Sequence, residues 1–204
     1  GMAGEADALV DQADLGGCRQ MVDAGGGSGV YSIALCRKYP GLKATIIDRP
    51  ETLAVTREFV SRQDLGDRIE LRPGDIRRDP LGDQLDAVLL SDVTYDHGEA
   101  VEILTNVERC LRTGGRLILR GYYFDPERST PLFGALFAVH QLTMDAGMEV
   151  LTLPALTGLI AATGLVISKV SPLTDRSCFI VARKDQAHDH HIGSDPAFGS
   201  TNYG

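Results

Sequence analysis

A glycine-rich segment near the start of the chain has the composition of a nucleotide-binding loop. Residues 22–29 read VDAGGGSG and follow a short apolar run. Glycines here let the backbone approach a ligand closely, and a helix that starts behind them offers free N–H donors. The dinucleotide fingerprint requires a third Gly or Ala where this chain has Val30, which disfavours a nicotinamide cofactor. The glycines expected to bind a nucleoside cofactor are Gly25, Gly26, Gly27 and Gly29.

Three carboxylates accompany this loop. Asp23 precedes the first glycine by two residues, Asp48 closes an apolar run, and Asp75 follows another in the segment PGDI. A carboxylate at the position of Asp48 can accept both hydroxyl protons of a ribose. Because several acids would repel a pyrophosphate, they favour a cationic sulfonium nucleoside. The alternative is that the glycines only form a tight turn and the acids only cap helices.

The elements that must position these residues alternate along the chain. Short apolar runs alternate with stretches of helical period, which predicts an α/β fold with a doubly wound, mostly parallel sheet. Strands are expected at residues 20–23, 43–48, 69–72, 87–91, 116–120, 166–171 and 178–181. The last two are expected to form an antiparallel hairpin. Helices are expected at residues 6–13, 29–38, 51–62, 98–111, 132–144 and 153–162, and a glycine stop at Gly114 is expected to end the fourth of them.

Length and charge restrict the classes of function. The 204 residues suit one domain, which we expect at 19–184, with a helical lead-in at 1–18 and a polar tail at 185–204. The net charge of −8 gives little support to nucleic-acid binding and favours a small, uncharged or cationic substrate.

Cysteines and histidines bear on the compartment and on metals. The four cysteines lie far apart without a CxxC pair, which indicates free thiols rather than disulfides or a zinc ribbon. With no candidate membrane span or secretion signal in the sequence, a cytoplasmic protein is expected. His188, His190 and His191 have the composition of a metal-binding tract but are interpreted as part of a solvated tail, so no metal site is expected.

Five segments together carry a family resemblance, in the order VDAGGGSG, YPGLKATIIDRPE, DRIELRPGDI, DAVLLSDVTYDHGEA and LRTGGRLILRGYYFDPE. They resemble the catalytic domain of small-molecule O-methyltransferases, including the plant caffeic-acid type and bacterial polyketide- or antibiotic-tailoring enzymes. The resemblance runs from about residue 14 to 184. It implies a seven-stranded Rossmann-like sheet and S-adenosylmethionine as methyl donor, with S-adenosylhomocysteine as product.

The resemblance also implies roles for individual residues. Gly25 would lie at the methionine end of the cofactor, and Asp48 would hold the ribose hydroxyls with Arg49 beside it. Asp75 would bind the adenine amino group, with Ile76 packing nearby. Ser91 matches a position that contacts the cofactor carboxylate, where many relatives have Lys.

The chain departs from the family at the catalytic positions. The family's general base is a His in a segment resembling LSNVLHDW, and this chain has Tyr95 in its place. The two acids that flank that His fall at Gly121 and at or next to Val150. The family's N-terminal dimerisation domain, which also closes the substrate pocket, is not matched, so a monomer or weak dimer is expected.

Three residues remain as catalytic candidates, each with a structural alternative. Tyr95 could hydrogen-bond an acceptor or act as a base if its pKa were lowered, or its ring could only pack over the cofactor. His97 could transfer protons or face solvent at the start of a helix. His140, which aligns with a His common in relatives, could face the pocket mouth or be structural. Tyr122, Tyr123 and Phe124 could form an aromatic wall or belong to the core.

Two functions are consistent with these observations. The first is methyl transfer from S-adenosylmethionine to an oxygen, or else a nitrogen or carbon, of a small molecule. Positioning supplies much of the rate of such a displacement, so the missing His does not exclude it. The second is a non-catalytic S-adenosylmethionine-binding module, suggested by Tyr95, Gly121 and Val150 at the catalytic positions. A nicotinamide-dependent oxidoreductase is a weaker third.

Overall fold

The computed structural model describes residues 2–126 and 131–185, without the side chains of Met2 and Ala3. The histidines of the expected tail lie outside this part. Seven strands run through it: β1 (Gln20–Ala24), β2 (Lys43–Asp48), β3 (Ile69–Pro73), β4 (Leu85–Ser91), β5 (Leu111–Gly121), β6 (Leu165–Pro172) and β7 (Cys178–Lys184). The helices are α1 (Met2–Ala13), α2 (Val30–Lys38), α3 (Pro50–Ser61), α4 (His97–Cys110), α5 (Leu132–Met144) and α6 (Leu153–Ala162).

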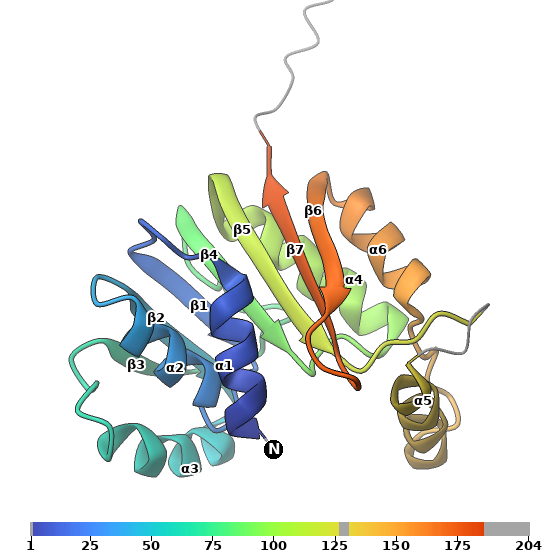
Figure 1. Cartoon of the computed structure of the whole chain (residues 1–204), viewed down its shortest axis with the longest axis horizontal. Helices are drawn as coiled ribbons and strands as arrows, with labels where there is room; N and C mark the ends of the chain where they lie inside the picture. The colour runs from blue at the N-terminus through green and yellow to red at the C-terminus, as the bar shows by residue number, and fades with distance from the viewer. Residues whose placement is uncertain (1, 127–130, 186–204) are drawn as a thin grey trace, which may run out of the picture.

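The strands form one sheet in the order β3-β2-β1-β4-β5-β7-β6 (Figure 1). Strands β1 to β5 pair in parallel, whereas β7 is antiparallel to β5 and β6. The expected Rossmann-like sheet and its C-terminal antiparallel hairpin are therefore confirmed. The strand order reverses between β1 and β4, and ligands of open α/β sheets bind at such a switch point.

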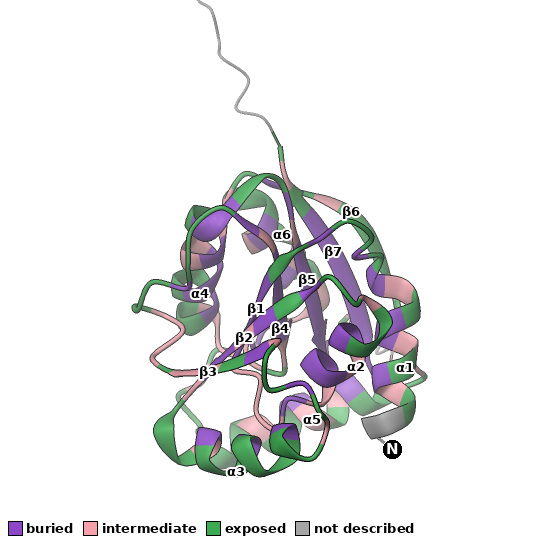
Figure 2. Cartoon of the chain, turned by 90° about the vertical axis from the view of Figure 1, so that its left-hand side faces the viewer, coloured by how far each residue is buried: buried purple, intermediate pink, exposed green. Residues whose placement is uncertain are grey.

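Two hydrophobic cores cover the two faces of the sheet. Helices α1, α2 and α3 bury side chains such as Leu9, Leu35 and Leu53 on one face. Helices α4 and α6 bury Leu104 and Leu156 on the other. Because both faces are covered, the central strands are buried along most of their length (Figure 2). No helix in the described ranges combines the length and apolar character needed to cross a membrane.

The largest boundary difference from the sequence-based expectation lies at the start of β5. The fourth expected helix ends at Cys110, before the glycines, and β5 begins at Leu111 rather than at residue 116. Leu111 is extended and buried, and it pairs with Leu85 of β4. The glycine stop at Gly114 was thus a wrong prediction, because burial of Leu111 against the sheet ends the helix earlier.

Candidate active site

A cavity of about 920 Å³ opens at the carboxyl ends of the parallel strands. Gly25 follows β1, Asp48 ends β2, Asp75 follows β3, and Asp92 follows β4, so the topology brings four separate segments to one edge of the sheet. Gln141 of α5 and the nearby Met148 also line the cavity. Ligand pockets are typically about 300–1,000 Å³ in volume, so this cavity has room for a nucleoside cofactor together with a small acceptor.

Five of the ten residues predicted to bind the cofactor line this cavity, namely Gly25, Asp48, Arg49, Asp75 and Ile76. The other five are not among its described lining residues, namely Asp23, Gly26, Gly27, Gly29 and Ser91. Of the three catalytic candidates, Tyr95 lines the cavity, whereas His97 and His140 are not among the lining residues. The structure thus brings the ribose and adenine candidates together, and the roles of all these residues stay predictions.

The glycine loop is packed closely against the segment that follows β4. Gly25 has φ +76°, and a Cβ atom on it would lie 2.5 Å from Cγ1 of Val93. Its N–H donates to the Ile47 carbonyl at 2.7 Å. Glycine tolerates this left-handed backbone and leaves room for Val93. The loop therefore presents bare backbone to the cavity at the switch point between β1 and β4.

Asp23 lies beneath the loop and is fully buried. Its Oδ2 accepts a 2.7 Å hydrogen bond from the Ser32 hydroxyl, and Oδ1 has no partner within the described residues. A Cβ atom on Gly26 would lie 2.6 Å from the carboxyl carbon of Asp23. Burial raises the pKa of Asp23 from 3.8 to about 6. The position of Asp23 thus indicates support of the loop, and direct cofactor contact stays a prediction.

The raised pKa of Asp23 predicts a pH-dependent loss of stability. Because the folded protein holds this proton more tightly than the unfolded chain, the contribution is favourable at pH 4 and falls as pH rises to about 6. The two pKa values differ by an amount worth about 3 kcal/mol. Urea unfolding of wild type and Asp23→Asn between pH 4 and 7 should show wild type losing about 2 kcal/mol relative to the variant, because part of the full difference is already lost at pH 4, just above the unfolded pKa. Parallel pH curves would show that Asp23 does not titrate in this way.

Each carboxylate oxygen of Asp48 accepts one hydrogen bond from the backbone and can accept another. Its Oδ2 accepts from the Gly27 N–H at 2.9 Å, and its Oδ1 accepts from the Arg49 N–H at 2.7 Å. These bonds fix the carboxylate at the end of β2 and tie it to the glycine loop. Each oxygen keeps a lone pair for an additional donor. Arg49 is exposed beside it, 3.6 Å from Glu51.

Asp75 is held by an arginine that the sequence analysis did not single out. The guanidinium of Arg77 forms two hydrogen bonds of 2.9 Å to the two carboxylate oxygens of Asp75, and it also contacts Glu99 at 2.9 Å. These hydrogen bonds lower the pKa of Asp75 to about 2. The carboxylate is therefore ionised at neutral pH and can accept a hydrogen bond from an amino group. Ile76 lies next to it on the cavity wall.

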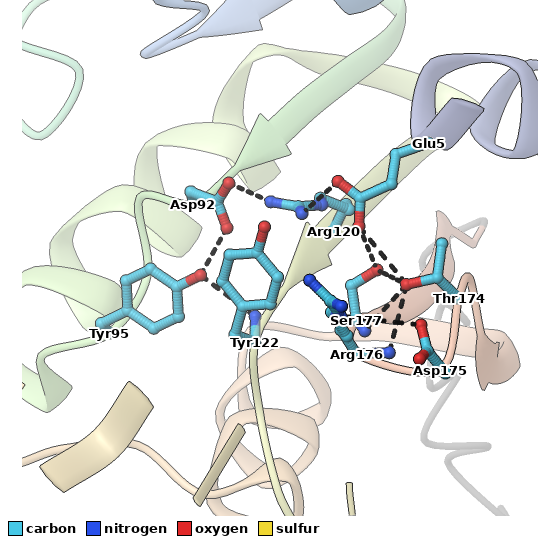
Figure 3. Close-up of polar contacts among 9 residues, drawn as sticks. All are labelled: Glu5, Asp92, Tyr95, Arg120, Tyr122, Thr174, Asp175, Arg176 and Ser177. Atoms are coloured by element: carbon cyan, nitrogen blue, oxygen red, sulfur yellow. Dashed lines mark hydrogen bonds and ion pairs between the residues drawn. The ribbon is translucent and has the colours of Figure 1, made fainter. Parts of the chain in front are cut away.

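Tyr95 is buried, and its hydroxyl is occupied. The hydroxyl donates to Oδ1 of Asp92 and accepts from the Tyr122 N–H at 3.0 Å (Figure 3). Burial and the neighbouring Asp92 carboxylate raise the pKa of Tyr95. A phenol with a raised pKa keeps its proton at neutral pH. The structure therefore gives no support to a base role of Tyr95 through a lowered pKa, and a structural role fits the geometry.

This structural role of Tyr95 predicts a loss of stability in Tyr95→Phe. The variant leaves the Tyr122 N–H without its acceptor and removes a donor from Asp92. An orphaned buried partner costs about 1–3 kcal/mol, and urea unfolding should show a loss in this range. Tyr39→Phe, on a partly exposed ring, serves as control. Equal unfolding free energies for Tyr95→Phe and wild type would contradict the role assigned to this hydroxyl.

The sequence did not reveal a network of buried ion pairs that is linked to Tyr95 through Asp92. Arg120, at the end of β5, is 1% exposed and contacts Asp92 on one side and Glu5 of α1 at 2.7 Å on the other. Glu5 in turn accepts hydrogen bonds from Thr174 and Ser177 in the turn between β6 and β7 (Figure 3). The signal that could have revealed it is a charged residue in the otherwise apolar run LILR. Its partner Glu5 lies 115 positions away, beyond any local pattern.

The two candidate histidines lie at the surface. His97 begins α4 with a 40% exposed side chain, and its Nδ1 lies 3.9 Å from Glu149. His140 is exposed on α5 and contacts the ring of Phe137. The alternative stated for His97, a solvent-facing residue at the start of a helix, fits its position, whereas the role of His140 stays a prediction. Within the described ranges, no cluster of histidine, cysteine and acidic side chains could hold a metal ion.

The positions of the two missing family acids are filled differently. A Cβ atom on Gly121 would lie 2.4 Å from the ring of Tyr123, so this buried ring occupies the space that a larger side chain would need. Val150 forms a bridge with Asp96. Tyr122 packs against Phe133 and Phe137 rather than lining the cavity. Tyr123 is therefore a core residue, which was one of the two alternatives stated for it. Tyr122 forms an aromatic cluster with Phe133 and Phe137 of α5.

The cavity residues fit the expected nucleoside cofactor. Gly25 offers bare backbone, Asp48 keeps free lone pairs at the end of β2, and Asp75 is ionised at the end of β3. The charged lining residues are Asp48, Arg49, Asp75, Arg77, Asp92, Asp96 and Glu99, which together carry a net charge of −3. Such a lining suits a cation better than a phosphate.

Comparison with known proteins gives a consistent result. The family model of the O-methyltransferase domain matches residues 4–159. The chain is 34% identical over 136 residues to 3-hydroxy-5-methyl-1-naphthoate 3-O-methyltransferase of Streptomyces sahachiroi, which covers 66% of this chain and 39% of that protein. It is 31% identical over 140 residues to L-tyrosine C(3)-methyltransferase of Streptomyces lavendulae, which covers 68% of this chain and 38% of that protein.

Solved structures share the fold. Human N-acetylserotonin methyltransferase in complex with S-adenosylmethionine superposes with a TM-score of 0.77 at 24% identity, over 89% of this chain and 52% of that one. The chain thus spans less than two fifths of the length of the two curated relatives and about half of this structure.

Proposed function

Because this chain belongs to the O-methyltransferase domain family, we propose that it binds S-adenosylmethionine in the cavity and transfers the methyl group to a small organic molecule. The single observation that carries this proposal is the convergence of Gly25, Asp48 and Asp75 on one cavity. We propose that Gly25 approaches the methionine end, Asp48 accepts the ribose hydroxyl protons, and Asp75 accepts from the adenine amino group. Arg49 and Ile76 would flank these contacts.

For the remaining predicted residues we propose supporting roles. Asp23, Gly26, Gly27 and Gly29 would shape the loop, since Asp23 lies under Gly26 and Gly29 precedes α2. Ser91 lies within hydrogen-bonding reach of the Tyr31 hydroxyl at the end of β4. We propose that it contributes to the carboxylate end of the cofactor only weakly.

The chemistry requires positioning more than a base. When bound, S-adenosylmethionine supplies a methyl group that is activated toward in-line displacement by its sulfonium charge. The Tyr95 hydroxyl keeps its proton, and His97 and His140 are absent from the lining of the cavity. We therefore propose that the cavity walls hold the acceptor in line with the methyl group, and that the acceptor is uncharged or cationic, as the acidic lining favours. Oxygen is the proposed acceptor atom, and the tyrosine C(3)-methyltransferase among the relatives keeps carbon as an alternative.

A transfer assay tests this proposal. The chain would be incubated with methyl-labelled S-adenosylmethionine and a panel of phenols, enols and amines, and labelled products would be identified by mass spectrometry. Label in a small molecule, lost in Asp48→Ala, is the expected result. Cofactor binding without transfer to any acceptor would instead favour the non-catalytic module.

Assembly and location are proposed on separate grounds. For the 204-residue chain by itself we propose a monomer or weak dimer, and a concentration-independent dimer in sedimentation velocity would contradict this. The cysteines Cys18, Cys36, Cys110 and Cys178 are buried free thiols, which supports a reducing compartment such as the cytoplasm. The proposed domain covers residues 19–184, with 1–18 as lead-in and 185–204 as tail.

A further inference from the structure

Asp92 occupies a special place in the cavity. It follows β4 with φ +60°, a left-handed conformation that is uncommon for residues other than glycine, and its N–H donates to the Arg120 carbonyl at 3.1 Å. The next residue, Val93, packs directly on the glycine loop at Gly25. The Asp92 side chain is 39% exposed and lines the cavity. Asp92 therefore lines the cavity next to the residue that packs on the loop, at the switch point of the sheet.

The other carboxylates of the cavity have identifiable tasks. Asp75 and Glu99 share Arg77, and Asp96 caps α4 by accepting from the Glu99 and Glu149 N–H groups at 3.0 and 3.2 Å. Asp48 organises the glycine loop. Asp92, by contrast, accepts no backbone hydrogen bond within the described residues, and its two oxygens each take one side-chain donor, from Tyr95 and from Arg120. A lone pair on each oxygen is left for a ligand.

Arg120 does not cancel the charge of Asp92, because it is shared. The guanidinium contacts Glu5 on its far side at 2.7 Å, and Glu5 is itself held by Ser177 at 2.9 Å. Two carboxylates and one guanidinium carry a net charge of −1. Arg120 is only 1% exposed, so water does not screen these charges at the guanidinium. The excess negative charge therefore acts on the cavity at Asp92, whose side chain is 39% exposed.

We propose that Asp92 is the counter-charge for the sulfonium of S-adenosylmethionine, and that it makes the cavity distinguish the charged donor from its neutral thioether product. This inference rests on the proposed function and adds a specificity-determining residue to it. Methyl transfer removes the positive charge from sulfur, and with it the attraction to Asp92. The same carboxylate would thereby favour exchange of spent product for fresh donor.

Calorimetry with three ligands tests this proposal. They are S-adenosylmethionine, S-adenosylhomocysteine, and sinefungin, in which a protonated amine replaces the sulfonium. Asp92→Asn keeps the shape of the side chain and tolerates the left-handed backbone. We expect it to weaken binding of both charged ligands about tenfold relative to S-adenosylhomocysteine, from the loss of one nearby charge in a partly desolvated site.

Two further variants make the result specific. Glu5→Gln changes no residue that lines the cavity, but it lets Arg120 neutralise Asp92. We therefore expect it to lower the ratio of the affinity for each charged ligand to the affinity for S-adenosylhomocysteine. The expected decrease is about threefold, because Glu5 is the more distant charge. Asp67→Asn removes an exposed carboxylate that is not among the residues lining the cavity, and it should leave the ratio unchanged.

The outcomes separate this proposal from the proposed function. Wild type that binds none of the three ligands would refute the function itself. Wild type that binds them, with Asp92→Asn and Glu5→Gln changing all affinities by one common factor, would overturn the role of Asp92. If Asp92→Asn lost its cooperative melting transition, the affinities of Glu5→Gln for the charged ligands relative to S-adenosylhomocysteine would by themselves support or overturn the role of Asp92.

Discussion

Arg120→Met is expected to lower the free energy of unfolding by about 3–5 kcal/mol, because breaking a buried ion pair leaves its partners uncompensated. Glu5 and Asp92 both depend on this guanidinium, and they lie on segments that meet only in the folded protein. The arginine also stacks on the Tyr122 ring, 4.2 Å from its centroid. Methionine has a similar length but can satisfy neither carboxylate. Urea unfolding at pH 7 measures the loss.

Arg62→Met is the matched control for this substitution. Arg62 contacts Glu58 at 3.9 Å on α3, and the two side chains are 72% and 73% exposed. Exposed pairs of this kind contribute about 0–1 kcal/mol. Equal free energies of unfolding for Arg120→Met and Arg62→Met would show that the buried ion pairs of Arg120 with Glu5 and Asp92 do not stabilise the fold.

Asp48→Ala is expected to weaken binding of S-adenosylmethionine by about 100- to 10,000-fold. Hydrogen bonds to charged groups contribute about 1.5–3 kcal/mol each, and the variant removes both proposed ribose contacts. It also removes the acceptor for the Gly27 N–H, so the glycine loop loses its tie to β2. S-adenosylhomocysteine should lose affinity by a similar factor, because the ribose is common to both ligands. Isothermal titration calorimetry on folded variant measures both.

Asp67→Ala provides the control, because Asp67 is an exposed carboxylate before β3 and is not among the cavity residues. Its loss changes the net charge by the same amount. Equal affinities for wild type and Asp48→Ala, with the Asp67→Ala variant unchanged, would refute the ribose role of Asp48.

Much of the fold follows from local patterns in the sequence. The alternation of apolar runs and helical stretches predicts all seven strands, because the central strands are buried on both faces and are therefore mainly apolar. The prediction that Gly114 ends the fourth helix was wrong because a glycine in the sequence does not reveal that Leu111 already pairs with Leu85 of β4. Asp48 and Asp75 were predictable as cavity residues, since the carboxyl ends of parallel strands share one edge.

The electrostatic network of the site could not be predicted in the same way. The partners of Arg120 come from α1 and from the segment after β4, so only the folded topology brings them together. The pattern of β1 likewise does not say that Asp23 faces Ser32 beneath the loop rather than the cavity. For Tyr95, the family resemblance identified the position, but the hydroxyl's partners depend on Tyr122, which follows β5.

The most direct measurement is a calorimetric titration of S-adenosylmethionine and S-adenosylhomocysteine into the wild-type chain. We expect saturable binding with one ligand per chain, and its loss in Asp48→Ala. No binding of either ligand at millimolar concentration, by a chain that shows a cooperative melting transition, would contradict the assignment of this cavity to the methyl donor.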